Sequence, residues 1–253
     1  MIDPALIPTD ICSRQGLNDL NQLLARLEAR KIDRITLQEP ETGFRVSNYL
    51  RTYCQANIRR CLSLFESSYG LFFTENVLVS LLCVRAIYET VAAFCHFEQK
   101  FQTVLAKGDL AEIFEFVKAK AHATRSEHLL QKHGEAVKAV SILTQIEKLK
   151  SLRPKVWEEY EFLSDITHPN SLGSFHFFAS NPDDRDVVTF SDGGQDPRAD
   201  LQWILVGCHM LTHFEAALIR IEAALPGLSE KGRDQSPNLR KKQDDVGPAG
   251  GDA

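Results

Sequence analysis

The segment Asn76–Phe97 reads NVLVSLLCVRAIYETVAAFCHF and is the most apolar stretch of the chain. Apolar residues occupy almost every face of its first half, which predicts a helix at the centre of the fold. Arg85, Glu89 and His96 interrupt the segment, so it lacks the roughly 18 uninterrupted apolar residues typical of a membrane span. We therefore expect a central, buried helix over residues 75–106 and no membrane contact.

Helical spacing of apolar residues also dominates the rest of the chain. It predicts six further helices, over residues 14–31, 45–68, 109–131, 135–151, 154–167 and 196–225. Thr74 is the expected N-cap of the central helix, because threonine accepts hydrogen bonds from the first free backbone N–H groups. Gly70 and Pro226-Gly227 are the expected ends of two other helices.

Two segments depart from this helical pattern. Residues 174–178 and 186–190 are short, apolar and aromatic, and a turn-rich segment separates them, which predicts a small β-hairpin within residues 173–191. Residues 229–253 contain almost no large apolar side chains, which predicts a disordered tail. The expected fold is therefore all-α, with about seven helices in a single domain over residues 1–228.

The composition indicates an ordinary globular protein. Of the 253 residues, 43% are hydrophobic and 25% are charged, and the formal net charge of -5 argues against a whole-protein grip on nucleic acid. Met1–Asp10 does not resemble a signal peptide, and none of the six cysteines forms a C-x-x-C pair. We expect reduced, buried thiols, a cytoplasmic location and no cofactor, because neither G-x-G-x-x-G nor a P-loop is present.

Arg85 and Glu89 are the first candidate site residues. They lie four positions apart on the central helix, so their side chains share one face and can pair. A charge in so apolar a helix needs a partner, because an unpaired buried charge is very costly. Two interpretations stay open: an internal ion pair, or an arginine that lines a site and is held by its glutamate.

A second candidate group follows at the end of the sixth expected helix. Helical spacing aligns Glu161, Ser164 and His168, with Tyr160 alongside. Pro169 should end the helix, which places His168 at its C-terminus. The histidine is therefore either a helix cap or a group at the mouth of a cleft.

His209 and His213 lie four residues apart on the last expected helix and could bind one metal ion. The glutamate of the H-E-x-x-H motif is absent. Gln202 and Arg220 share the same stripe, so a polar seam or an interface face is the alternative.

Two motifs resemble a known family. Bacterial proteins similar to the HEPN superfamily carry an R-x-x-x-E helix, as in Arg85–Glu89, and a later helix similar to Tyr160-x-x-Leu163-Ser164-x-x-x-His168-Pro169. The likeness covers residues 45–225 and implies an all-α bundle, often a homodimer. In active members it implies metal-independent RNA cleavage in toxin or antiphage systems, through an R-x(4–6)-H motif.

The chain departs from that catalytic motif. The positions that would hold its arginine are occupied by Glu161, Phe162 and Leu163. The leading expectation is therefore a HEPN-like helical domain that binds RNA, a protein partner or a small ligand in a polar cleft lined by Arg85, Glu89 and His168.

Two enzymatic alternatives remain. A metal-independent ribonuclease would use His168 as general acid or base and Arg85 to stabilise the phosphate. Ser164 and Tyr160 would lie beside them. A metal-dependent hydrolase would use His209 and His213.

Overall fold

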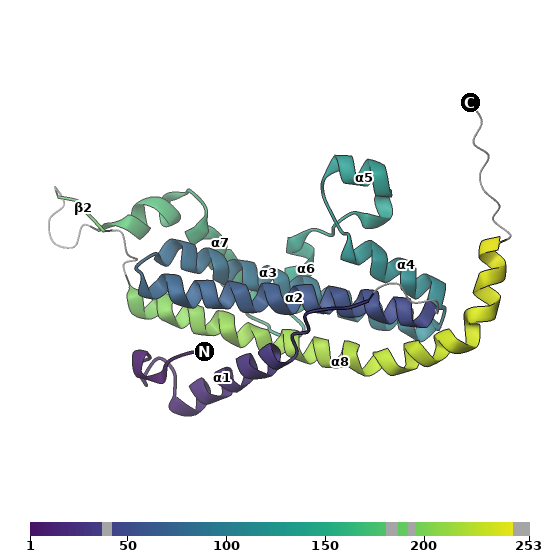
Figure 1. The fold of residues 1–253 in the computed structure, drawn as a ribbon. Helices are drawn as coiled ribbons and strands as arrows, with labels where there is room; N and C mark the ends of the chain where they lie inside the picture. The colour runs from purple at the N-terminus through teal and green to yellow at the C-terminus, as the bar shows by residue number, and fades with distance from the viewer. Residues whose placement is uncertain (37–41, 181–186, 192–195, 245–253) are drawn as a thin grey trace. The chain divides into compact units, whose positions relative to one another are not determined.

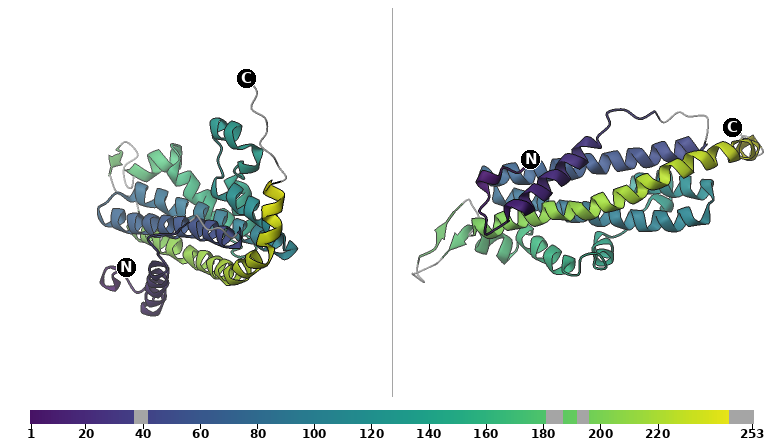
Figure 2. Two further views of the ribbon diagram at one scale, coloured as in Figure 1. Left: turned by 45° about the vertical axis from the view of Figure 1, so that its right-hand side comes forward. Right: turned by 90° about the horizontal axis from the view of Figure 1, so that it is seen from below.

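The computed structural model describes residues 1–36, 42–180, 187–191 and 196–244, of which 42–44, His176 and 231–244 are considered for their backbone alone. The described residues form an all-α fold with one small sheet (Figures 1 and 2). The α-helices are α1 (Arg14–Ala29), α2 (Thr42–Phe73), α3 (Val77–Lys107), α4 (Leu110–Ala121), α5 (Glu127–His133), α6 (Ile142–Leu149), α7 (Val156–Thr167) and α8 (Pro197–Asp244).

The chain divides into two compact units. The first comprises Met1–Lys31, Ala56–His96 and Val140–Ala217, and the second comprises Ile32–Gln55, Phe97–Ala139 and Leu218–Ala253. The long helices α2, α3 and α8 contribute residues to both units. The single domain expected for residues 1–228 stays a prediction.

In the first unit, α3 contacts α2, α7 and α8, which confirms its central position. Ser80 of α3 donates a hydrogen bond to the Ser68 carbonyl of α2 at 2.7 Å. On α8, the absence of a side chain at Gly207 permits close approach, because a Cβ there would lie 2.9 Å from a Val84 methyl of α3. The rings of Phe94 and Phe214 pack with centroids 4.3 Å apart.

The second unit has an aromatic core around Phe97. This ring lies 4.4 Å from the ring of Tyr53 and 5.5 Å from that of Phe116, measured between centroids. Beside this core, Arg220 donates two hydrogen bonds of 3.0 Å to Glu98, whose side chain is only 3% exposed. The ion pair compensates for burying that carboxylate.

The helix expected over residues 109–131 is wrong, because the structure divides it into α4 and α5. The break lies at Thr124, whose backbone N–H donates to the Val137 carbonyl at 2.8 Å. Its carbonyl accepts from Ala139 N–H at 2.9 Å. This pairing with a distant segment requires extended backbone, so helical spacing alone did not reveal it.

Other expected helix boundaries are also wrong, and the helix expected over residues 135–151 begins only at Ile142, as α6. Helix α2 continues past Gly70 to Phe73, and Thr74 bonds back to the Leu71 carbonyl instead of capping α3. Helix α8 continues past Pro226-Gly227, where burial of Leu228 stabilises the next turn. The backbone of residues 229–244 continues α8, and residues 245–253 of the expected tail lie outside the described part of the chain.

The expected β-hairpin is present but shorter and shifted. β1 (Ala179–Ser180) pairs antiparallel with β2 (Thr189–Phe190). The expected first strand, 174–178, is helical instead, because Asn170 accepts a hydrogen bond from Gly173 N–H at 2.9 Å and begins a helical turn. The turn-rich loop expected at residues 181–184 lies outside the described residues.

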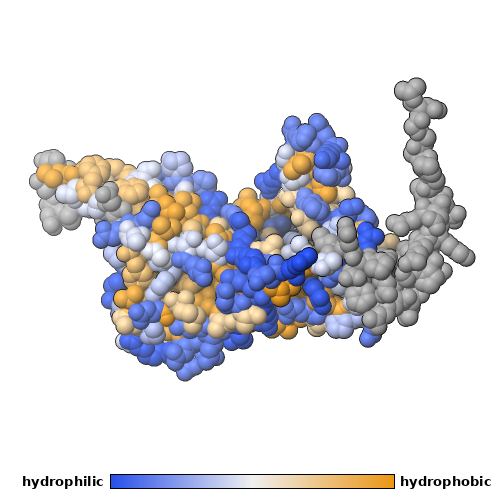
Figure 3. All heavy atoms as spheres, viewed as in Figure 1, coloured by the Kyte–Doolittle hydropathy of each residue, from blue (hydrophilic) through white to orange (hydrophobic). Residues whose placement is uncertain are grey.

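Apolar side chains are exposed on the β1–β2 hairpin, at the upper left of Figure 3. They include Val187, Val188 and Phe190, the last of which is 77% exposed. Elsewhere the large apolar side chains mostly form the core.

Two helical stretches, Val77–Lys107 and Pro197–Glu230, are long and apolar enough to cross a membrane. More than half of each apolar window is buried inside the protein, 56% and 61% respectively, as in the core helices of soluble proteins. The finding is a weak indication of a membrane span.

All six cysteines are free thiols, as expected among the described residues. Four are buried, namely Cys54, Cys61, Cys95 and Cys208, whereas Cys12 and Cys83 are half-buried. Burial raises the pKa of five of these thiols, which disfavours the reactive thiolate of Cys12, Cys54, Cys61, Cys83 and Cys208.

Candidate functional site

Two tyrosine–glutamate hydrogen bonds join α3 to α7 reciprocally. Tyr88 of α3 donates to Glu159 of α7 at 3.0 Å. Tyr160 of α7 donates to Glu89 of α3 at 2.9 Å. The dipeptides Tyr88-Glu89 and Glu159-Tyr160 therefore exchange equivalent bonds, and we call these four residues the Tyr–Glu latch.

An arginine supports each carboxylate of the latch. Arg85 Nε lies 3.3 Å from Glu89 Oε1, and its terminal nitrogens donate to Thr167 Oγ1 at 3.0 Å and to the Tyr160 hydroxyl at 3.4 Å. Arg153 donates two hydrogen bonds of 2.6 Å to Glu159. The ion pair expected between Arg85 and Glu89 is thus present, and both of its side chains also form hydrogen bonds with α7.

His168 lies outside this network. Its backbone N–H donates to the Ser164 carbonyl at 3.0 Å and ends α7, as expected from Pro169. Its side chain is exposed, whereas Ser164 is half-buried. Among the described residues, no hydrogen bond or ion pair joins the His168 side chain to Arg85. The structure therefore brings together Arg85, Glu89 and Tyr160 and leaves the other two candidates at the helix end.

His209 and His213 have different surroundings. His209 is exposed and lines a groove beside α1. Burial lowers the pKa of His213, and the positive charge of Arg153 lowers it further, so this ring is neutral at pH 7. The cation near His213 also disfavours a metal ion. No group of three or more His, Cys, Asp or Glu side chains suited to a metal occurs among the described residues.

A groove in the first unit lies beside His209. Its cavity volume is about 550 Å³, and its walls are helices α1 and α8 with the segment before α1. Its lining residues are Ile11, Cys12, Gly16, Asp19, Leu20, Gln22, Leu23, Arg26, Gln202, Leu205, Val206, His209 and Thr212. We call this hollow the α1–α8 groove. Apolar side chains form most of its floor, and polar side chains stand at its rim.

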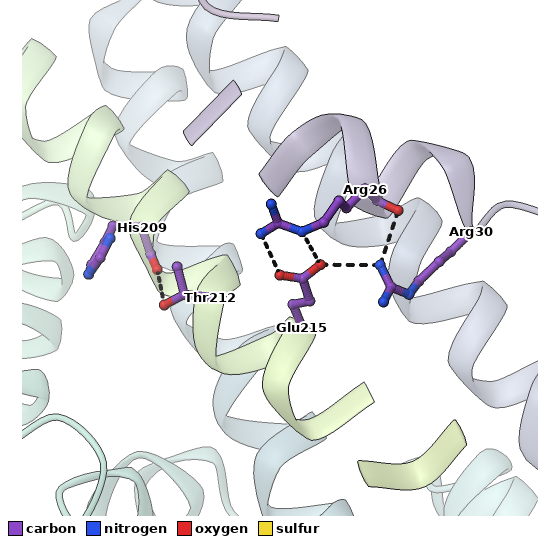
Figure 4. A network of polar contacts seen from close by, with 5 residues as sticks. All are labelled: Arg26, Arg30, His209, Thr212 and Glu215. Carbon is purple, nitrogen blue, oxygen red and sulfur yellow. Dashed lines mark hydrogen bonds and ion pairs between the residues drawn. The ribbon is translucent and has the colours of Figure 1, made fainter. Parts of the chain in front are cut away.

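Ion pairs fix the two walls of the groove to each other. Glu215 of α8 accepts two hydrogen bonds of 2.8 Å from Arg26 of α1 and one of 3.1 Å from Arg30, the C-cap residue of α1 (Figure 4). These hydrogen bonds, with the positive charges, lower the pKa of Glu215. The carboxylate therefore stays ionised at neutral pH and holds the C-terminal end of α1 on α8.

Asp200, in the first turn of α8, carries a buried carboxyl group. The residue is 7% exposed, and its Oδ2 atom has no hydrogen-bond partner among the described residues. Burial, followed by the charge of Asp196, raises its pKa from 3.8 to about 6. The folded state thus holds this proton more tightly than the unfolded state does.

We expect Asp200→Asn to stabilise the protein at pH 7. A raised carboxyl pKa makes the free energy of unfolding fall as pH rises from about 4 to about 6, and the asparagine removes that fall. The expected gain at pH 7 is about 1–2 kcal/mol, less than for a fully buried carboxylate. Urea unfolding measured from pH 4 to pH 8 checks this, and parallel pH profiles for the two proteins would contradict it.

The sequence alone did not reveal the groove or its ion pairs. Arg26 and Arg30 lie four residues apart beside the apolar stripe of α1, and Glu215 interrupts an apolar part of α8. Those three charges were a signal that two helices meet there. The partner of each charge could not be chosen from spacing, because 189 residues separate Arg26 from Glu215.

Comparison of the chain with family models, with curated proteins and with solved structures gave no match. The similarity to HEPN proteins therefore stays an expectation that rests on the two short motifs.

Proposed function

We propose that this protein is a non-catalytic helical domain that binds another molecule in the α1–α8 groove. The observation that carries the proposal is the groove itself, whose volume of about 550 Å³ lies in the range of ligand sites. Its apolar floor with a few polar groups at the rim is also the usual composition of such sites.

The groove differs from the cleft that the sequence suggested. Arg85, Glu89 and His168 line no part of it. The hydrogen bonds and the ion pair of Arg85 are made to Thr167, Tyr160 and Glu89, which accounts for a charge in an apolar helix without a substrate. The polar seam suggested for the last helix supports the proposal better, because Gln202 and His209 both line the groove.

The proposal includes the HEPN-like resemblance, which implies a helical scaffold. A helical scaffold that departs from the R-x(4–6)-H motif is compatible with binding in place of RNA cleavage. The resemblance suggests RNA or a protein as partner, a homodimer and a role in antiphage defence. The reduced thiols suggest a cytoplasmic location.

Small fragments test the proposal directly. We expect a fragment library screened by ligand-observed NMR to yield compounds that bind the full chain. Tryptophan at the groove rim, in Gln22→Trp and His209→Trp, should weaken their binding at least tenfold by filling the groove. Both positions are exposed, so both variants should fold. Asn18→Trp, exposed on α1 but outside the groove, is the matched control and should bind normally.

Two results would contradict the proposal. One is a screen in which no fragment binds the filled variants more weakly than it binds the control. The other is cleavage of total RNA by the purified protein in EDTA that His168→Ala abolishes, because this result would establish the ribonuclease alternative.

A further inference from the structure

The two walls of the α1–α8 groove have a similar periodicity. The α1 wall consists of Gly16, Asp19, Leu20, Gln22, Leu23 and Arg26, and the α8 wall consists of Gln202, Leu205, Val206, His209 and Thr212. Each α8 residue stands 186 positions after a residue of the α1 wall, as Gln202 does after Gly16, and Gln22 has no counterpart among the α8 residues. Steps of three and four residues keep both sets on one helix face.

Ion pairs also join both ends of the α1 wall to α8. Near the start of α1, Asp10 forms an ion pair with Arg198 of α8. Near its end, Arg26 and Arg30 bind Glu215. Both helices therefore run in the same direction along the groove, as Figures 1 and 2 also show. From residue 16 to residue 26 the α1 wall extends about 15 Å, or nearly three helical turns.

This geometry fits a helix better than a compact ligand. Two helices that run in the same direction, with apolar residues at three- and four-residue steps, leave a groove between their ridges, which the side chains of a third helix can fill. Leu20, Leu23 and Leu205 form the floor, and Val206 is half-buried beside them. A partner helix would supply apolar residues at positions i, i+3 or i+4, and i+7.

Charges at the two ends specify the partner further. Asp19 is exposed at one end of the groove. At the other end, Arg26 pairs with Glu215 but its side chain remains 50% exposed. The groove therefore presents a carboxylate at Asp19 and a guanidinium at Arg26, two helical turns apart.

We infer that the α1–α8 groove receives an amphipathic α-helix of about three turns from a partner protein. Its apolar face lies on the leucine floor, a basic side chain lies beside Asp19, and an acidic side chain lies beside Arg26. This inference rests on the proposed function and names the class of its ligand.

A displayed library of random 16-residue peptides tests the inference with the full chain as bait. We expect the enriched peptides to have apolar residues at helical spacing and to become helical on binding by circular dichroism. A basic residue should recur about two turns from an acidic one. Binding should fall at least tenfold for the double variant Gln22→Trp/His209→Trp and stay unchanged for Asn18→Trp.

Asp19→Lys provides the sharper test. Selection against this variant should replace the basic residue of the enriched peptides with an acidic one, whereas Asn18→Lys should leave it in place. Asp19 is exposed, so the substitution leaves the core intact.

Each remaining outcome overturns a defined claim. If the peptides require an open groove but are not helical, the inference of a partner helix is wrong and the proposed function is still supported. Peptides that ignore Asp19→Lys overturn the charge arrangement. Equal binding of the peptides to the filled double variant and to the wild type overturns both the partner helix and the proposed function. An enriched set that corresponds to a segment of this chain overturns the partner helix alone.

Discussion

Glu159→Ala is expected to lower the free energy of unfolding by about 3 kcal/mol. The substitution removes the acceptor of the Tyr88 hydroxyl and both acceptors of Arg153. Tyr88 is fully buried, and burial raises its pKa, so its hydroxyl keeps its proton and needs an acceptor. Arg153 is only 21% exposed and would lose its ion-pair partner. Urea unfolding followed by circular dichroism measures the loss.

Glu158→Ala is the matched control for this experiment. Glu158 is adjacent on α7 but exposed, so its loss should change stability by less than about 0.5 kcal/mol. Equal losses for the two variants would show that the latch contributes nothing specific. Tyr160→Phe and Glu89→Gln then test the reciprocal bond, because residues joined by a hydrogen bond should show a coupling energy in a double-mutant cycle.

Gly173→Ala is the second substitution with a large expected effect, a loss of about 2–4 kcal/mol. A Cβ at this position would lie 2.1 Å from the His168 carbonyl oxygen and 2.4 Å from that of Ile166. Both atoms belong to backbone at the end of α7, so no side-chain rotation relieves the clash. Thermal and urea unfolding check the loss of stability.

Gly70→Ala is the opposite case and serves as control. A Cβ at Gly70 meets nothing within 4 Å, and the residue lies within α2, three positions before its end. Alanine should therefore stabilise the protein by about 0.5–1 kcal/mol, because glycine loses more backbone entropy in a helix. Stabilisation by Gly173→Ala would mean that the turn after α7 is not packed as the structure describes.

Local rules predicted several parts of the fold correctly. Apolar periodicity predicted the central helix α3, and Pro169 predicted the end of α7 at His168. The four-residue spacing of Arg85 and Glu89 predicted their ion pair. In each case the interacting groups lie within about one helical turn of each other, so the sequence contains the necessary information.

The predictions that were wrong concern helix boundaries that depend on contacts with distant segments. The break between α4 and α5 depends on the pairing of Thr124 with the backbone around Val137. The continuation of α8 past Pro226 accompanies the burial of Leu228. Distant segments decide both features, and local propensity is too weak to oppose such contacts.

The apolar segment Asn76–Phe97 determined by itself that the protein is built around a buried helix, because no other conformation hides so many apolar side chains at this spacing. Only the tertiary structure decided what the polar residues in and around that helix do. In the folded unit, Arg85 and Glu89 bind groups of α7, and a groove lies between α1 and α8. The physical reason is that helix faces are encoded locally, whereas the choice of which faces meet depends on the packing of the whole unit.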